Sequence, residues 1–241
     1  MSIHRFKYPD PTATAQACAR HILTTLEEAL AGEGEATLAI SGGSTPKLMF
    51  AEMAKHRFDW DHVHLFWVDE RCVPPTDEQS NFKMADEAFI VPAHFPRRNV
   101  HRVVGELRPE VGAERYASEI TDYFGLSEGQ MPHFDIIHRG IGADCHTASL
   151  FPGEPLIGDR EHLAAAVYAE KLHSWRVTML PGILINAKHT VMLVCGEDKA
   201  QPVKDIFEQP YDPMKYPAQL GSHDGRSVSW FLDEPAAALM D

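Results

Sequence analysis

The sequence predicts an α/β protein, with residues 1–241 forming one domain around a doubly wound, mostly parallel β-sheet that has helices on both faces. Short apolar runs alternate with segments of helical periodicity over almost the whole chain, and this order implies right-handed crossovers between parallel strands. Glycines and polar residues follow several apolar runs, at the strand ends where such sheets bind ligands. With 241 residues, 44% of them hydrophobic, the chain can bury one large core.

The elements of the first half follow from their periodicity. Apolar residues at helical spacing predict an amphipathic helix over Thr12–Leu30, which Gly32 and Gly34 end. The elements expected next are, in order, a strand at Thr37–Ile40, a helix at Lys47–Ala54, a strand at Val63–Val68, a helix near Phe82–Phe89, a strand near Val100–Val103, a helix at Pro109–Phe124 and a strand at Phe134–Ile137.

The alternation continues in the second half, where a helix is expected to begin after the last of these strands. The later elements are strands near Ala164–Tyr168 and Arg176–Met179, a helix at Pro181–Ala187, a strand at Thr190–Cys195 and a helix at Asp198–Phe207. Prolines and glycines predict a long loop over 209–225, which returns the chain to a final strand at Ser227–Leu232 and a short closing helix.

Charge and hydropathy limit the classes of partner. The 22 basic residues against 35 acidic ones give a formal net charge of -13, which disfavours nucleic acids and acidic membrane surfaces. The N-terminus lacks the apolar region of a signal peptide, and no stretch approaches the roughly 20 apolar residues of a membrane helix. These features indicate a soluble cytoplasmic protein that acts on a small molecule.

The cysteines and histidines form no recognisable metal pattern. The four cysteines lack CxxC spacing, so neither a zinc site nor a disulfide framework is expected. The 14 histidines include no HxxxH or HExxH pair. We therefore expect no metal ion.

The most informative segment is 134–153, FDIIHRGIGADCHTASLFPG. Its apolar run leads into Gly140 and Gly142, which allow positive φ and close approach of a ligand to the main chain. Asp144 and His146 follow where a helix is expected to begin, and two titratable groups there suit proton transfer to a bound anion. The same residues also fit an ordinary strand-to-helix turn with Asp144 as its N-cap.

A second glycine-rich loop, SGGSTP at 41–46, lies between a buried strand and a helix. Its N–H groups and hydroxyls, at Gly42, Gly43, Ser44 and Thr45, suit a phosphate at the positive end of the helix dipole. An ordinary βα turn with a Ser or Thr cap explains the loop equally well. The GxxxxGK[ST] pattern is absent, so a nucleoside triphosphate is not indicated.

Charged residues follow the buried run at 63–68. Packing does not explain Asp69, Glu70 and Arg71 at this strand end, and an arginine there has the geometry to hold a carboxylate or phosphate. A solvated or internally paired cluster is the alternative. Arg176 and Lys199 also lie next to apolar runs, but a lysine or arginine at such a position is by itself more often a surface cation than a ligand.

Taken together, these motifs resemble those of the 6-phosphogluconolactonase family. The segments SGGSTP, VDERCVPPTDEQSNF, FDIIHRGIGADCHTASLFPG, RVTMLPGILINAKHTVMLV and GEDKA occur in this order, and the resemblance covers roughly residues 10–235. It implies a glucosamine-6-phosphate deaminase-like, modified Rossmann fold. The deaminases themselves continue from the turn histidine as IAFNEPG and favour a DEY-like strand end, whereas this chain has TASLFP and DER.

The resemblance also implies roles for the candidate residues. His146 would activate the water that attacks the C1 carbonyl of 6-phospho-D-glucono-1,5-lactone, and Asp144 would orient or polarise the site. Neither a metal nor a redox cofactor is needed for this hydrolysis. Binding of the substrate and its phosphate is implied for Gly42, Gly43, Ser44, Thr45, Arg71, Arg176 and Lys199, with Arg71 nearer the lactone end. Oligomeric state is left open.

Two departures from the family pattern affect these expectations. Cys145 stands where the family usually has glycine, a change that a negative φ would tolerate. His138 and Arg139 replace the usual apolar residues, and they place either a cation near the site or a polar pair on the sheet. The alternative functions are a deaminase-like isomerase and a non-catalytic sugar-phosphate-binding module.

Overall fold

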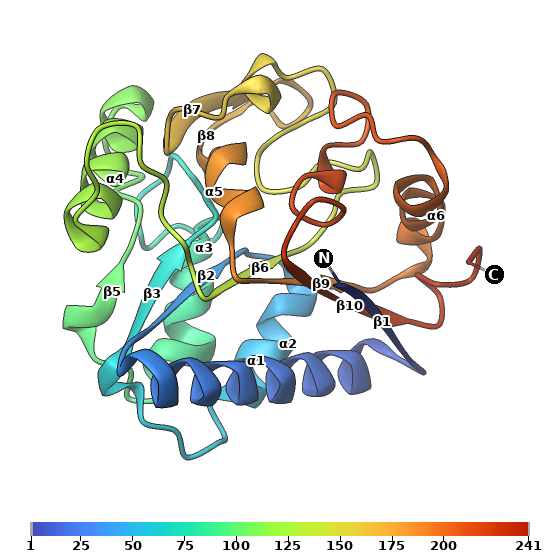
Figure 1. Ribbon diagram of the computed structural model, residues 1–241, viewed down its shortest axis with the longest axis horizontal. Coiled ribbons are helices and arrows are strands. Elements are labelled where there is room, and N and C mark those ends of the chain that lie inside the picture. The colour runs from blue at the N-terminus through green and yellow to red at the C-terminus, as the bar shows by residue number, and fades with distance from the viewer. Residues whose placement is uncertain (1, 241) are drawn as a thin grey trace.

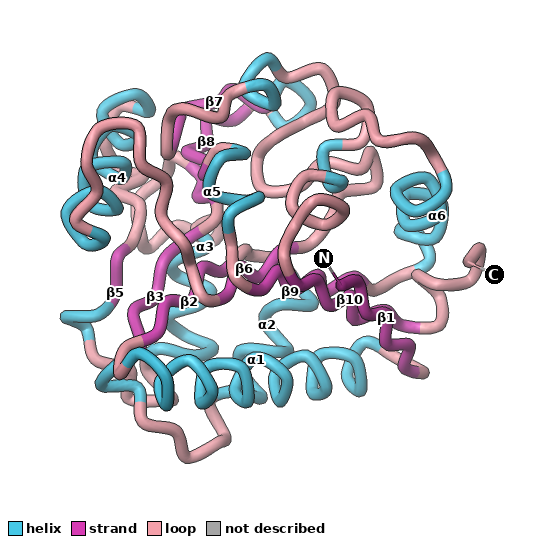
Figure 2. The backbone as a smooth tube through the Cα atoms, in the orientation of Figure 1, coloured by secondary structure: helices cyan, strands magenta, loops and turns pink. Residues whose placement is uncertain are grey.

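A seven-stranded parallel sheet forms the centre of the structure, a computed structural model that describes residues 2–240. Its strand order is β1-β10-β9-β6-β2-β3-β5 (Figures 1 and 2). The strands are β1 (Ser2–Tyr8), β2 (Ala36–Ile40), β3 (Val63–Trp67), β5 (Val100–His101), β6 (Ile136–Arg139), β9 (His189–Val194) and β10 (Ser227–Asp233). The order reverses between β2 and β6, because β3 and β5 extend the sheet in one direction and the later strands extend it in the other.

Helices cover both faces of this sheet. Figure 1 shows α1 and α2 on one face, with α5, α6 and a second small sheet on the other. The α-helices are α1 (Pro11–Glu33), α2 (Ser44–Met53), α3 (Asn81–Ala85), α4 (Pro109–Phe124), α5 (Pro181–Asn186) and α6 (Ala200–Glu208). The predicted class, a doubly wound and mostly parallel α/β fold, is confirmed. None of the helices within residues 2–240 is long and apolar enough to cross a membrane.

Local signals explain where α1 begins and ends. The Asp10 side chain accepts a hydrogen bond from the Ala13 N–H at 2.9 Å, and Pro11 occupies the first turn, where no N–H is needed. At the other end Gly34 takes a φ of 78° and donates its N–H to the Leu30 carbonyl.

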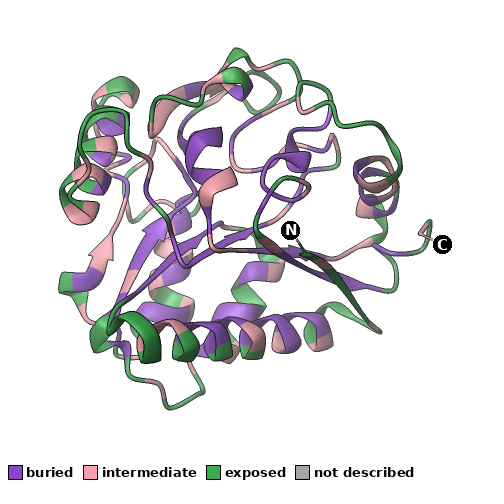
Figure 3. Ribbon diagram, in the orientation of Figure 1, coloured by how far each residue is buried: buried purple, intermediate pink, exposed green. Residues whose placement is uncertain are grey.

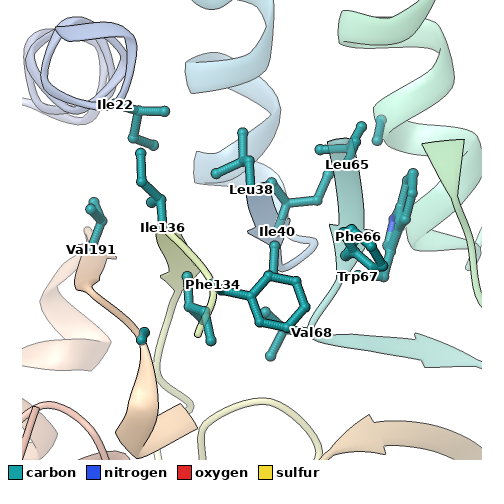
Figure 4. Close-up of a cluster of buried hydrophobic side chains, with 14 of the residues drawn as sticks. Ile22, Leu38, Ile40, Leu65, Phe66, Trp67, Val68, Phe134, Ile136 and Val191 are labelled. Atoms are coloured by element: carbon teal, nitrogen blue, oxygen red, sulfur yellow. The ribbon is translucent and has the colours of Figure 1, made fainter. Parts of the chain in front are cut away.

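Part of the core lies between α1 and the central strands. Ile22 of α1 packs toward Leu38, Ile136 and Val191, which come from three neighbouring strands (Figure 4). All five residues of β2 are buried, as expected for a strand covered on both faces (Figure 3).

The second sheet is antiparallel, with the order β4-β8-β7, and comprises β4 (Asp69–Arg71), β7 (Ala164–Ala169) and β8 (Ser174–Met179). The strands expected near 164–168 and 176–179 therefore do not join the parallel sheet. The physical reason is their short connection, since only four residues separate Ala169 from Ser174 in the hairpin, too few for a parallel crossover. Val68 links the two sheets: its N–H bonds to Ile40 and its carbonyl accepts from Met179, both at 2.8 Å.

Other differences lie at edges and ends. The strand β1 was not expected, because SIHRFKY is a mostly exposed edge strand without a clear apolar run. The expected closing helix is a series of turns, and the segment near Phe82–Phe89 divides into α3 and a π-helical turn at Asp86–Ile90. The helix expected after Asp144 and His146 is also absent, since that stretch forms a turn and a bridge between Thr147 and Leu150.

Candidate active site

A small polar cavity of about 120 Å³ lies at the carboxyl ends of β2 and β6. This is where the strand order of the parallel sheet reverses, the usual ligand position in such folds. The second sheet contributes one wall through β4 and β8. The lining residues are Ser41, Gly42, Asp69, Arg71, Asn81, Gly140, Ile141, His146, Ala148 and Arg176.

A histidine–aspartate pair forms one side of the cavity. His146 Nδ1 lies 2.6 Å from Asp144 Oδ1, and Lys171 Nζ lies 3.1 Å from the other carboxylate oxygen. The hydrogen bond from His146 holds the pKa of Asp144 well below its usual range, against the opposing effect of burial. An ionised carboxylate only accepts hydrogen bonds, so in neutral His146 the proton lies on Nδ1 and Nε2 is the basic nitrogen.

The turn before this pair leaves no space for a side chain at Gly142. A Cβ atom there would lie 2.0 Å from His146 Nδ1, and the Gly142 N–H donates to the His146 carbonyl at 2.8 Å. The Phe151 ring packs against the imidazole with centroids 4.6 Å apart. Gly142 and Phe151 therefore both restrict the position of the imidazole.

Two arginines of the second sheet form another side of the cavity. Arg71 and Arg176 are direct partners in the β4–β8 pairing, and Asp69 Oδ2 lies 3.9 Å from Arg176 Nη1. Burial lowers the pKa of Arg176, and the Asp69 carboxylate acts in the opposite direction. The guanidinium remains protonated at neutral pH. Among the residues that the structure describes, Arg176 Nε and Ser41 Oγ are buried without a hydrogen-bond partner. Both atoms belong to residues that line the cavity.

A buried carboxylate organises the loop that brings Asn81 to the cavity. Glu70 accepts hydrogen bonds from the N–H groups of Arg71, Asn81 and Phe82, each at 2.7 Å, and from Ser80 Oγ at 3.1 Å. Burial raises the pKa of Glu70, whereas these backbone donors act in the opposite direction.

Asn81 then packs closely against the glycine-rich loop. Its Nδ2 donates to the Asp69 carbonyl at 2.9 Å. A Cβ atom at Gly42 would lie 1.9 Å from Asn81 Oδ1, so this position requires glycine.

The structure brings some of the predicted site residues together and leaves others outside the cavity. Gly42, Arg71, His146 and Arg176 line it, and Asp144 lies directly behind His146. Residues 43–45 form the N-terminal start of α2 beside Gly42 and do not line it.

Lys199 also lies outside this lining. It ends a short 3-10 turn after β9, where its Nζ pairs with Asp198 at 2.8 Å.

Sequence reasoning did not single out Ser41, Asp69 or Asn81 as ligands, although each lies within a motif already noted. Lys171 carried no sequence signal. A larger cavity, of about 510 Å³, lies between α4 and β7, and none of the predicted site residues lines it.

The structure also shows where the two departures from the family pattern lie. Cys145 has a φ of 65°, so the backbone lies in the left-handed region rather than at the negative φ that would tolerate a side chain. His138 and Arg139 are fully buried and do not line the cavity. Arg139 instead donates to the Leu220 carbonyl at 2.6 Å, behind the turn.

The fold and the site together define an α/β protein with a histidine–aspartate pair and two arginines around a small polar cavity, where the strand order of the sheet reverses. The family model for glucosamine-6-phosphate isomerases/6-phosphogluconolactonase matches residues 9–230. The chain belongs to this family.

Named relatives and solved structures agree with this assignment. The chain is 34% identical over 218 residues to a 6-phosphogluconolactonase of Synechocystis, covering 89% of each chain. It is 36% identical over 219 residues to a 6-phosphogluconolactonase of Treponema pallidum, covering 90% of each. A crystal structure of a devB protein superimposes with a TM-score of 0.89 at 33% identity, over 100% of both chains. A monomeric glucosamine-6-phosphate deaminase shares the fold, with a TM-score of 0.82 at 20% identity over 98% of this chain and 99% of that one.

Proposed function

We propose that this protein is a 6-phosphogluconolactonase, which hydrolyses 6-phospho-D-glucono-1,5-lactone to 6-phospho-D-gluconate in the oxidative pentose phosphate pathway. The observation that carries the proposal is the arrangement of the His146–Asp144 pair and two arginines around one cavity. A neutral imidazole suits attack by water on a lactone, and guanidinium groups suit an anionic sugar phosphate. The lactonase names of relatives 34% and 36% identical support the same substrate.

In the proposed reaction, His146 Nε2 removes a proton from water as the water oxygen bonds to C1. The carbonyl becomes an oxyanion, and the tetrahedral intermediate collapses with cleavage of the bond between C1 and the ring oxygen. The imidazolium then returns its proton to that ring oxygen, which leaves as the C5 hydroxyl. General base catalysis of this kind typically contributes about 10²–10⁴-fold.

Asp144 supports both protonation states of the imidazole. Its carboxylate accepts the Nδ1–H bond at 2.6 Å, so that Nε2 carries the free lone pair. The same negative charge stabilises the imidazolium that forms during attack.

We place the phosphate against Arg176 and the loop of Gly42, Gly43, Ser44 and Thr45, with Lys199 as a further cation, and Arg71 near the lactone and hydroxyl end. The support for this orientation is that Arg176 and Gly42 line the cavity and α2 begins at Ser44. The overall charge of -13 makes such local cations necessary for an anionic substrate.

The proposed hydrolysis needs neither a metal ion nor an organic cofactor, because a lactone carbonyl is reactive enough toward a positioned water and a neutral base. The charge and composition further support a cytoplasmic protein whose partner is this small sugar-phosphate lactone, with no nucleic acid or membrane partner.

The decisive experiment follows acid release from freshly generated 6-phosphogluconolactone, with the spontaneous rate subtracted. We expect turnover without added cofactor, undiminished by EDTA, and much weaker turnover of unphosphorylated gluconolactone. Ammonia release from glucosamine 6-phosphate would indicate the isomerase instead. Binding of 6-phosphogluconate without lactone turnover would indicate a binding module.

A further inference from the structure

The hairpin that joins β7 to β8 ends in a four-residue loop that contacts the turn carrying Asp144 and His146. Its last strand pair is Ala169 with Ser174, and Glu170–Leu172 form a 3-10 turn. His173 completes the loop in the left-handed region, with a φ of 47°. Loops of this length and form hold the residues at their tip in a defined direction.

Aromatic packing stabilises the strands just below that tip. Tyr168 and Trp175 are direct cross-strand partners, and their ring centroids lie 5.3 Å apart. Such pairs stabilise antiparallel strands beyond the main-chain hydrogen bonds. This aromatic pair therefore stabilises the hairpin directly next to its loop.

From the tip, Lys171 reaches across to the turn that carries the His146–Asp144 pair. Its Nζ lies 3.1 Å from Asp144 Oδ2, while Asp144 Oδ1 accepts from His146 Nδ1 at 2.6 Å. The two carboxylate oxygens thus have different donors. Because β8 also carries Arg176, the hairpin links the arginine side of the cavity to its histidine side.

We propose that Lys171 is a positioning residue for the lactonase reaction and acts through Asp144. By engaging Oδ2, the ammonium group fixes the carboxylate rotamer that directs Oδ1 at the imidazole. It also neutralises part of the negative charge that Asp144 places beside the imidazole. This inference rests on the proposed function, in which His146 is the base.

Other charged and aromatic groups also lie around the histidine. Arg71, Arg176 and Asp69 line the cavity from β4 and β8, and the Phe151 ring covers one side of the imidazole. None of them is altered when Lys171 is replaced. The Lys171 side chain is 74% exposed, so its loss removes little packing, and exposed ion pairs contribute little to stability.

The test compares Lys171→Met, which removes the charge, with Lys171→Arg, which retains it. Lys55→Met is the matched control, because Lys55 is also an exposed lysine paired with a carboxylate, Glu52 at 2.8 Å, and it does not line the cavity. For each variant, kcat and KM are measured with phosphorylated and plain lactone over a range of pH, and folding is checked by thermal unfolding.

We expect Lys171→Met to lower kcat about tenfold on both lactones, with little change in KM, as for a misaligned catalytic group. The acid limb of its kcat profile moves to higher pH, by about half a unit at low salt. Lys171→Arg restores most of both properties, and Lys55→Met changes neither.

Two results would overturn the inference. One is an unchanged kcat and acid limb in Lys171→Met, while replacement of His146 still abolishes turnover. The other is a rise in KM confined to the phosphorylated lactone, which would make Lys171 a phosphate ligand. Turnover that survives replacement of His146 would instead remove the proposed function itself.

Discussion

Cys145 has a backbone conformation that residues with side chains rarely adopt, with a φ of 65° inside the turn that carries Asp144 and His146. Left-handed backbone costs an ordinary residue roughly 1–2 kcal/mol, which explains why the family usually has glycine there. Here the side chain is buried in a cluster with Val203 and Ile206, and its packing offsets part of that cost. Burial also raises the pKa of Cys145 to about 11, so the thiol remains protonated and unreactive.

Replacement of His146 tests the assignment of the base. His146→Gln should lower kcat by at least ~10²-fold, because the variant cannot accept the proton from water, while KM changes little. The matched control is His162→Gln, since His162 also pairs with an aspartate, at 2.8 Å from Asp159 Oδ2, but lies outside the cavity. Near-normal turnover by His146→Gln in the lactone assay contradicts the assignment.

His138 makes stability depend on pH. Burial, with the neighbouring Arg139 cation, lowers the pKa of His138 to about 3, whereas an unfolded histidine titrates near ~6.5. Between these two pH values the unfolded chain binds more protons than the folded chain. The contribution of neutral His138 to stability is therefore complete above about pH 6.5 and falls as the pH drops toward 3. The loss amounts to about 1.4 kcal/mol per pH unit at most.

Urea unfolding of the wild type and of His138→Met at pH 7.5 and pH 5 measures this effect. We expect the free energy of unfolding to fall less on acidification in the variant. An identical acid-induced loss in both proteins would show that other groups cause it.

At the scale of elements, the turn that carries Asp144 and His146 depends on close packing rather than on a helix. Sequence analysis expected a helix N-terminus at Asp144, but the turn is held by the Gly142 N–H bond to the His146 carbonyl and by Thr147 Oγ1 donating to the Gly140 carbonyl at 3.0 Å. Arg139, which lies just before the turn, donates a hydrogen bond to the Leu220 carbonyl of the long loop.

Gly142→Ala tests this dependence. The new Cβ would lie 2.0 Å from His146 Nδ1, so the imidazole must move and kcat should fall about 10²-fold, the cost of a displacement near 1 Å. Gly158→Ala is the control, because no atom lies within 4 Å of a Cβ there. Full activity of Gly142→Ala, with normal thermal unfolding of both variants, would mean that the turn can relax without loss of geometry.

At the scale of the whole molecule, the first and the last strand of the chain lie side by side in one sheet. The N-terminal strand β1 pairs in parallel with β10 along seven residues, and β10 in turn pairs with β9. Two apolar clusters, one around Trp67 and one around Trp230, both include residues of β9 and β10. We propose that residues 1–241 unfold as one domain, because neither cluster can open without breaking these strands.

Tryptophan fluorescence can follow each cluster separately. The double variant Trp60→Phe/Trp67→Phe leaves Trp230 as the buried tryptophan of one cluster. Trp230→Phe leaves Trp60 and Trp67, which both lie in the other cluster. In each variant, the fluorescence and far-UV circular dichroism midpoints in urea should coincide. Separate midpoints within one variant would show two independently unfolding parts.

The sequence by itself determined the α/β class, the order of most elements and the family, and it singled out His146 and Asp144 as a candidate pair. These features are local. Periodicity over a few turns predicts a helix such as Pro109–Phe124. His146 and Asp144 are two positions apart in one turn, so they lie close together whatever the position of that turn in the fold. The edge strand β1 was not predicted because it is mostly exposed and therefore has no clear apolar run.

Only the tertiary structure decided which distant residues meet. The pairing of Arg71 with Arg176 and the contact between Lys171 and Asp144 depend on the second sheet, in which β4 is far from β7 and β8 in the chain. Sheet membership depends on long-range hydrogen bonding and on the length of the connections, which local periodicity does not record. For the same reason the positive φ of Cys145, which the packing of the turn imposes, became visible only in the folded chain.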